Sequence, residues 1–252
     1  MRKSYRELTE EIKTDGERLK LIAALGSSDD LAYHYALISE DWAAGGTLML
    51  ENSFDRHGEA GIVFLLERLR AFGTASKTDA SAAAGTAIGS GAYTDTAYLA
   101  AKILSQLRHR DFYAARAKEL AALLTARWEI SDIALRRKQI IALGWIGSEA
   151  AVDVVIRTMR GDTDALCGAW AAAALMQLSF HAVDAAFLRE RTKTAFAEAI
   201  QKESDLNATG IMLEAAQTLF GKKWISAAAA EAAEPAAIEK AKKSALRFLG
   251  KA

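Results

Sequence analysis

The stretch DIALRRKQIIALGWIG, residues 132–147, indicates the fold of this chain more clearly than any other. Its apolar residues from Ile140 to Ile146 are spaced so that they cover a broad part of a helix surface. A helix with such a surface is expected to be buried on several sides. Gly147 then favours the left-handed conformation that ends a helix, and Ser148 is suited to cap the next one. The stretch therefore predicts a buried helix followed by a tight turn into a second helix.

The composition extends this helical prediction to the whole chain. Of 252 residues, 51% are hydrophobic and 25% charged, which is typical of a globular protein and excludes a disordered chain. One Pro and 1 Cys exclude a collagen-like protein and an internal disulfide scaffold. Residues 61–72 carry apolar side chains at helical spacing, whereas alternation with a period of two is hard to find. We expect an all-α fold without a β-sheet.

A Gly-Ser pair between two apolar segments occurs three times. The pairs are Gly26-Ser27, Gly89-Ser90 and Gly147-Ser148. They are separated by 63 and 58 residues, and half of either interval is about 30 residues, the size of one helical pair in a repeat protein. The spacing predicts a helix–helix turn at each pair and a repeat built from two helices.

Residues 132–178 resemble the HEAT-repeat family, in the short form found in phycobilisome lyases. Residues 132–147 are similar to the first helix of such a repeat, and residues 149–159 to the second. The acidic segment 162–164 resembles the turn into the next repeat, whose first helix would span 165–178. The resemblance says much about the fold and almost nothing about the function.

The resemblance implies a right-handed α-solenoid of about five to six HEAT-like helical pairs. We expect one domain over residues 1–252, because no segment is long enough to act as a linker. Longer helices are expected near 95–108 and 111–127. A polar capping helix is expected at about 235–249, since Pro235 suits the first helical turn.

No catalytic or metal-binding motif stands out. The four histidines are His34, His57, His109 and His181. None is directly followed by Glu, so the di-iron His-Glu pairs of HEAT-like deoxyhypusine hydroxylases are missing, and we expect no metal and no cofactor. Cys167 is expected to be a buried, unreactive thiol. Trp42, Trp145 and Trp170 fall in helical patterns and are expected in the core or between repeats.

The segment that begins at Trp128 resembles a second family, the HEAT-like alkylpurine DNA glycosylases. These enzymes place a Trp and an Asp on their concave face beside basic residues, and here Trp128 is followed by Asp132 and the basic run 136–138. Ser131, however, is expected to cap the helix that follows. Trp128 and Asp132 would then belong to different helices, with Asp132 stabilising a helix start.

Charge is distributed unevenly along a chain whose net charge is 0. Residues 1–70 carry 9 basic and 13 acidic side chains, and residues 71–140 carry 10 basic and 6 acidic ones. Ordinary solvated helix faces would explain this, and so would a polarised groove that attracts a charged partner. Arg136 is expected to be better exposed than Arg137, which shares a face with Ile140. The candidate partner-binding residues are Arg127, Trp128, Asp132, Arg136 and Lys138.

The sequence favours a non-enzymatic scaffold, assembly factor or inhibitor, such as an immunity protein, that binds another protein on a concave face. A DNA glycosylase for alkylated bases and a phycobilisome-type chromophore lyase subunit remain alternatives, so nucleic acid is a possible but less favoured partner. No secretory signal is recognised, and no apolar run approaches the ~20 residues of a membrane span. We expect a cytoplasmic protein that does not enter a membrane.

Overall fold

The computed structural model describes residues 2–78, 86–128 and 130–250. These residues form 13 α-helices and two short 3-10 helices (η), and no strand occurs among them. The elements are α1 (Tyr5–Glu11), α2 (Asp15–Gly26), α3 (Leu31–Ala43), η1 (Leu50–His57), α4 (Gly58–Thr78), α5 (Thr86–Gln106), α6 (Tyr113–Ala126), α7 (Ile133–Trp145), η2 (Glu149–Ala151), α8 (Val152–Gly161), α9 (Ala165–Phe180), α10 (Ala185–Lys202), α11 (Leu206–Leu219), α12 (Ala227–Glu231) and α13 (Pro235–Leu249). The all-α prediction is confirmed for this part of the chain.

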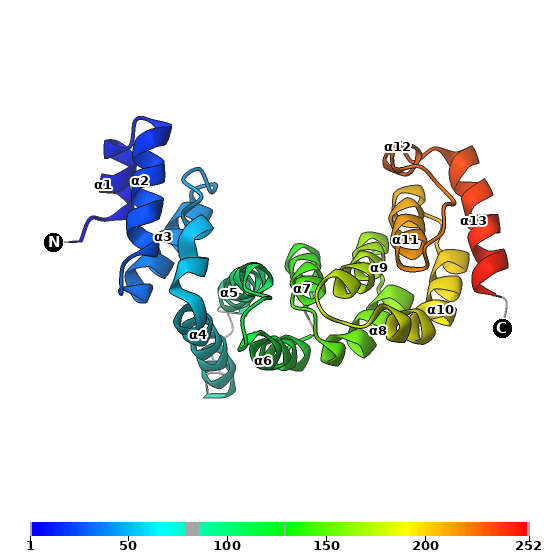
Figure 1. Cartoon of the computed structure of the whole chain (residues 1–252), viewed down its shortest axis with the longest axis horizontal. Helices are drawn as coiled ribbons and strands as arrows, with labels where there is room; N and C mark the ends of the chain where they lie inside the picture. The colour runs from blue at the N-terminus through cyan, green and yellow to red at the C-terminus, as the bar shows by residue number, and fades with distance from the viewer. Residues whose placement is uncertain (1, 79–85, 129, 251–252) are drawn as a thin grey trace.

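The helices form a curved, two-row arch (Figure 1). The inner row consists of α5, α7, α9 and α11, and each of these packs extensively against the next. The outer row contains α6, α8 and α10, with α13 packed against both α10 and α11 at the C-terminal end. α9 therefore has α7 and α11 on its two sides and α8 behind it, which leaves only its inner side uncovered.

Aspartate side chains start four of the central and C-terminal helices. Asp132, Asp164, Asp184 and Asp205 each accept a hydrogen bond from the backbone N–H three residues later, at 2.7–2.9 Å. Each bond satisfies a donor that the first helical turn leaves without a partner. The cap of α7 is thus Asp132, and the expectation of Ser131 was wrong by one residue.

The helix boundaries between residues 132 and 180 agree with those predicted from the sequence. α7, η2 with α8, and α9 occupy the predicted positions between residues 132 and 180, and α13 begins at Pro235 and ends at Leu249. The segment 61–72 lies within α4, and α6 fills most of the predicted 111–127. α5 is longer than the predicted 95–108, since it already begins at Thr86.

The three Gly-Ser pairs play three different roles. Gly147 has the predicted left-handed backbone, with φ +56. Gly26 ends α2 without a positive φ. A Cβ there would lie 2.8 Å from the Cβ of Ser53, so this glycine allows close packing against η1. The turn predicted at Gly89-Ser90 was wrong, because α5 continues through it. A helix tolerates an internal glycine at a cost of about 1 kcal/mol.

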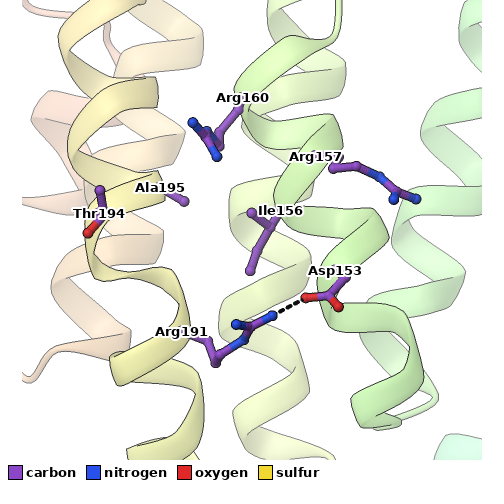
Figure 2. A pocket seen from close by; sticks show the side chains of 7 residues that line it. All are labelled: Asp153, Ile156, Arg157, Arg160, Arg191, Thr194 and Ala195. Atoms are coloured by element: carbon purple, nitrogen blue, oxygen red, sulfur yellow. Dashed lines mark hydrogen bonds and ion pairs between the residues drawn. The ribbon is translucent and has the colours of Figure 1, made fainter.

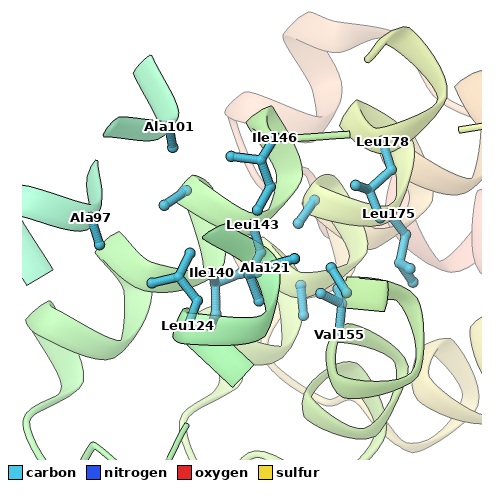
Figure 3. Close-up of a cluster of buried hydrophobic side chains, with 14 of the residues drawn as sticks. Ala97, Ala101, Ala121, Leu124, Ile140, Leu143, Ile146, Val155, Leu175 and Leu178 are labelled. Atoms are coloured by element: carbon cyan, nitrogen blue, oxygen red, sulfur yellow. The ribbon is translucent and has the colours of Figure 1, made fainter. Parts of the chain in front are cut away.

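Small residues bring the inner helices into close contact. A Cβ on Gly144 would lie 2.9 Å from the Cα of Ala174, so α7 and α9 meet almost backbone to backbone. Figure 3 shows the core beside this contact, with side chains such as Leu143, Leu175 and Val155 converging from α7, α9 and α8. The buried apolar side chains form one cluster that extends from Leu8 to Leu249.

Burial confirms some expectations for individual residues and corrects another. Ile140 and Cys167 are fully buried, as predicted, and burial raises the pKa of the Cys167 thiol to about 11, which keeps it protonated and unreactive. Trp170 was expected in the core or between repeats, but 38% of it is exposed. It lies on the inner side of α9, which no neighbouring helix covers.

Gly147→Ala should destabilise the protein by more than about 2 kcal/mol, because it combines a left-handed backbone with a direct clash. A Cβ at this position would lie only 1.4 Å from the carbonyl oxygen of His181. Gly221 is the matched control: its φ is +64, but no atom lies within 4 Å of an added Cβ. Urea unfolding should show a loss of about 1 kcal/mol for Gly221→Ala. Equal losses in the two variants would show that the close approach of Gly147 to residue 181 is wrong.

Candidate functional site

Partly exposed side chains line the inner side of the arch in a repeating register. Each helix of the inner row contributes residues spaced by three or four positions, which lie along one helix face. We call this surface the inner face. Its residues are Asp95, Tyr98 and Lys102 on α5; Lys138, Ile141 and Trp145 on α7; Leu166, Trp170, Ala173 and Gln177 on α9; and Asn207, Ile211, Glu214 and Thr218 on α11.

Three aromatic side chains meet at the N-terminal end of the inner face. The ring of Tyr98 lies 6.3 Å from that of Trp42 on α3 and 5.0 Å from that of Trp145, measured between centroids. We call these residues the aromatic cluster. The Lys138 ammonium lies 5.0 Å from the ring centroids of both Trp42 and Tyr98 and forms an ion pair with Asp95. All three rings are half-buried, so Trp42 and Trp145 lie at the surface as well as against the core.

Arg136 is held inside the protein. Its guanidinium forms an ion pair with Asp162 at 2.9 Å and donates a hydrogen bond to the Ile130 carbonyl oxygen at 2.8 Å. Only 16% of its side chain and 8% of that of Asp162 are exposed. The expectation that Arg136 is the better exposed candidate was therefore wrong. The acidic segment 162–164, which resembles the turn into the next repeat, binds both arginines of α7, since Arg137 forms an ion pair with Asp164 at 2.9 Å.

The other predicted contact residues also have partners within the chain. The Arg127 guanidinium donates to the Phe72 carbonyl oxygen at 2.6 Å, and the Trp128 indole N–H donates to the Thr158 hydroxyl at 3.0 Å. Trp128 follows the end of α6 and Asp132 caps α7, so the two belong to different helices, as expected. These contacts give the pair a structural role. Of the five candidates, the structure places only Lys138 on the inner face.

The acidic N-terminal segment neutralises part of the basic segment that follows it. Glu51 of η1 forms an ion pair with Lys102 of α5, and Glu59 of α4 forms one with Arg116 of α6, both at 2.9 Å. The charge difference along the sequence thus becomes a set of contacts between neighbouring helices. These ion pairs reduce the charge left for a polarised groove, which the charge difference along the sequence had suggested.

Asp162→Asn should destabilise the protein by about 1–3 kcal/mol, because it leaves the largely buried Arg136 guanidinium without its countercharge. The exposed pair Arg6–Glu10 on α1 provides the control, and Glu10→Gln should cost less than about 0.5 kcal/mol. Chemical denaturation of the two variants measures the difference. Similar small losses in both would indicate that Arg136 is solvated rather than held against the turn.

Two grooves are present in the C-terminal half. The first lies between α8 and α10 in the outer row and contains three arginines, Arg157, Arg160 and Arg191 (Figure 2). Arg191 forms an ion pair with Asp153 at 2.6 Å, and Arg160 forms one with Glu198 at 2.5 Å. The second lies between α9, α11 and α12 and is lined mainly by apolar residues with two carboxylates.

A histidine pair lies between α3 and η1, and no pattern in the sequence indicates it because its two members lie on different elements. His34 of α3 is fully buried, and its Nε2 lies 2.9 Å from the Leu50 carbonyl oxygen. A carbonyl only accepts, so this nitrogen carries the proton, and the His34 Nδ1 accepts from the Nε2–H of His57 at 2.8 Å. His34 is neutral in this arrangement, since one of its ring nitrogens donates and the other accepts. Burial lowers the pKa of each, and the charge of His57 lowers that of His34 further.

The pair should make the protein less stable in mild acid. The unfolded histidines bind protons near the ordinary pKa of 6.5, whereas the folded ones bind them only at lower pH. The unfolding free energy should therefore fall as the pH decreases from 7 to 5. Denaturant unfolding across this range should show that the unfolding free energy of the double variant His34→Gln/His57→Gln changes less with pH than that of the wild type. The exposed His109→Gln serves as control. A wild-type profile as flat as that of the double variant would contradict the buried pair.

Among the described residues, no group of three or more His, Cys, Asp or Glu side chains is arranged to hold a metal ion. No helix in the same part of the chain is both long and apolar enough to cross a membrane. Comparison with known proteins found no matching family model, no matching curated protein and no matching solved structure.

Proposed function

We propose that the chain is a HEAT-like α-solenoid that binds another protein on its inner face. The repeated inner and outer helices and the four aspartate caps support the relationship to helical repeats. In this interpretation, α13 is the terminal cap, because its buried residues follow a single stripe and its other side is polar. We retain the cytoplasm as the proposed location and a scaffold, assembly factor or inhibitor as the proposed role.

The observation that carries the proposal is the exposure of large aromatic side chains on the inner face. Trp145 and Tyr98 are half-buried within the aromatic cluster, and Trp170 is exposed on the adjacent helix. Tryptophan and tyrosine are among the residues that contribute most to protein–protein affinity. They are held by packed helices, so little conformational freedom is lost when a partner binds.

No comparable observation favours the alternatives. The Trp128 indole and the Asp132 carboxylate make local structural contacts, and the arginines of α7 are paired with acidic residues. These contacts give no support to a DNA glycosylase, and nothing in the described residues indicates a chromophore site. Protein binding is the function that the geometry supports best.

Trp145→Ala/Trp170→Ala should weaken partner binding at least about tenfold, since each side chain is expected to contribute more than 1 kcal/mol. The partner is first captured from native lysate on the immobilised chain and identified by mass spectrometry. Calorimetry with the purified partner then gives Kd for the wild type and the variant. Circular dichroism and melting temperature check that the fold is retained. The single variant Trp170→Ala leaves the half-buried Trp145 in place, so it tests binding without changing the packing around that side chain.

The matched control changes the outer row. Arg157 is exposed on α8, and Arg157→Ala should leave Kd unchanged. Unchanged affinity in the double tryptophan variant, or a loss of affinity only in the outer-row variant, would contradict binding on the inner face.

A further inference from the structure

The groove between α9, α11 and α12 has an apolar floor and two acidic groups. Its volume is about 460 Å³. The lining residues are Leu166, Asn207, Ile211, Glu214, Ala227, Ala230 and Glu231. One of them lies on the first turn of α9, three lie on α11, and the other three belong to α12. We call this groove the acidic pocket.

The wall formed by α12 is firmly attached. A Cβ on Gly210 would lie 3.0 Å from the Ala230 carbonyl oxygen, so α12 packs directly on the backbone of α11. The Gln217 side chain on α11 also binds the segment before α12. Its amide donates to the Ile225 carbonyl oxygen at 3.0 Å, and its oxygen accepts from the Trp224 N–H at 2.9 Å. The pocket is therefore part of the packed structure and does not depend on a loose loop.

The two carboxylates of the pocket have no cation beside them. Neither Glu214 nor Glu231 forms an ion pair among the described residues. At the other end of the inner face, by contrast, Asp95 is paired with Lys138. Burial and the charge of Glu231 raise the pKa of Glu214. The pocket thus holds two like charges over an apolar floor without an internal countercharge.

We infer that the acidic pocket receives an arginine or lysine side chain of the protein that binds the inner face. The aliphatic part of such a side chain would cover Leu166 and Ile211, while its cationic end would lie between Glu214 and Glu231. Trp170 follows Leu166 by one helical turn on the same face, so the pocket is continuous with the proposed binding surface. The inference rests on the proposed function and specifies the chemistry of the partner.

The outer groove does not offer the same complementarity. Two of its three arginines already have acidic partners, Asp153 and Glu198, within the chain. A cationic partner would meet repulsion there, and an anionic one would have to compete with existing ion pairs. The groove therefore serves as an internal control for the acidic pocket.

Methyl NMR with two short peptides tests the inference. The probe is acetyl-Leu-Arg-Leu-amide, and the control is the same peptide with citrulline, which has the shape of arginine but no charge. We expect the arginine peptide to shift the Ile211 and Leu166 methyl signals in a saturable way and to leave Ile156, in the outer groove, unchanged. The citrulline peptide should bind at least about fivefold more weakly. Binding should strengthen as the pH rises and Glu214 loses its proton.

Glu214→Gln/Glu231→Gln should remove the preference for arginine over citrulline. Glutamine preserves the shape of each side chain, and removing two like charges should not lower the melting temperature. Asp153→Asn, in the outer groove, is the matched control and should keep the preference. Absence of Ile211 shifts, equal shifts with both peptides, or an unchanged preference in the double variant would overturn the inference.

The captured partner separates this inference from the proposed function. If it binds Glu214→Gln/Glu231→Gln with wild-type affinity but loses affinity for Trp145→Ala/Trp170→Ala, the pocket inference is wrong and binding on the inner face stands. If the tryptophan variant also retains wild-type affinity, the proposed function itself is wrong. Loss of affinity in both variants supports both the pocket inference and binding on the inner face.

Discussion

The close approach of α7 and α9 is the constraint on which the rest of the arch depends. Gly144 faces the backbone of Ala174, and a Cβ on Gly144 would push the two helices apart. Because α9 is packed on both sides and from behind, its sequence consists largely of small and apolar residues, with only one face free. That face carries Leu166 and Trp170. The packing that buries the core thus also determines which side chains remain for a partner.

Several ion pairs in this protein connect neighbouring elements. The turn after α8 provides Asp162 and Asp164 to the two arginines of α7, and Asp164 also caps α9. One short acidic segment therefore links three helices. Against this background, the unpaired carboxylates Glu214 and Glu231 stand out, because they share a pocket without a cation. A charge without an internal partner is a better indication of a binding site than a surplus of charge along the sequence.

Local patterns in the sequence predicted the helices and parts of their packing, but not the site. Ile140 was correctly predicted in the core from its spacing, and Pro235 marked the start of α13. Exposure depends on contacts between helices distant in the sequence. Trp170, predicted in the core or between repeats, is therefore exposed, and Arg136, predicted as the better exposed arginine, is largely buried. The aromatic cluster combines three helices, and the His34–His57 pair joins α3 to η1. No spacing rule within a single helix predicts such contacts.

Binding of a protein partner to the inner face can be measured by hydrogen–deuterium exchange of the complex with the captured partner, compared with the free chain. We expect slower exchange in α7, α9 and α11 of the inner row, and unchanged exchange in α8 and α10 of the outer row. Protection concentrated in α8 and α10, with the inner row unaffected, would contradict it.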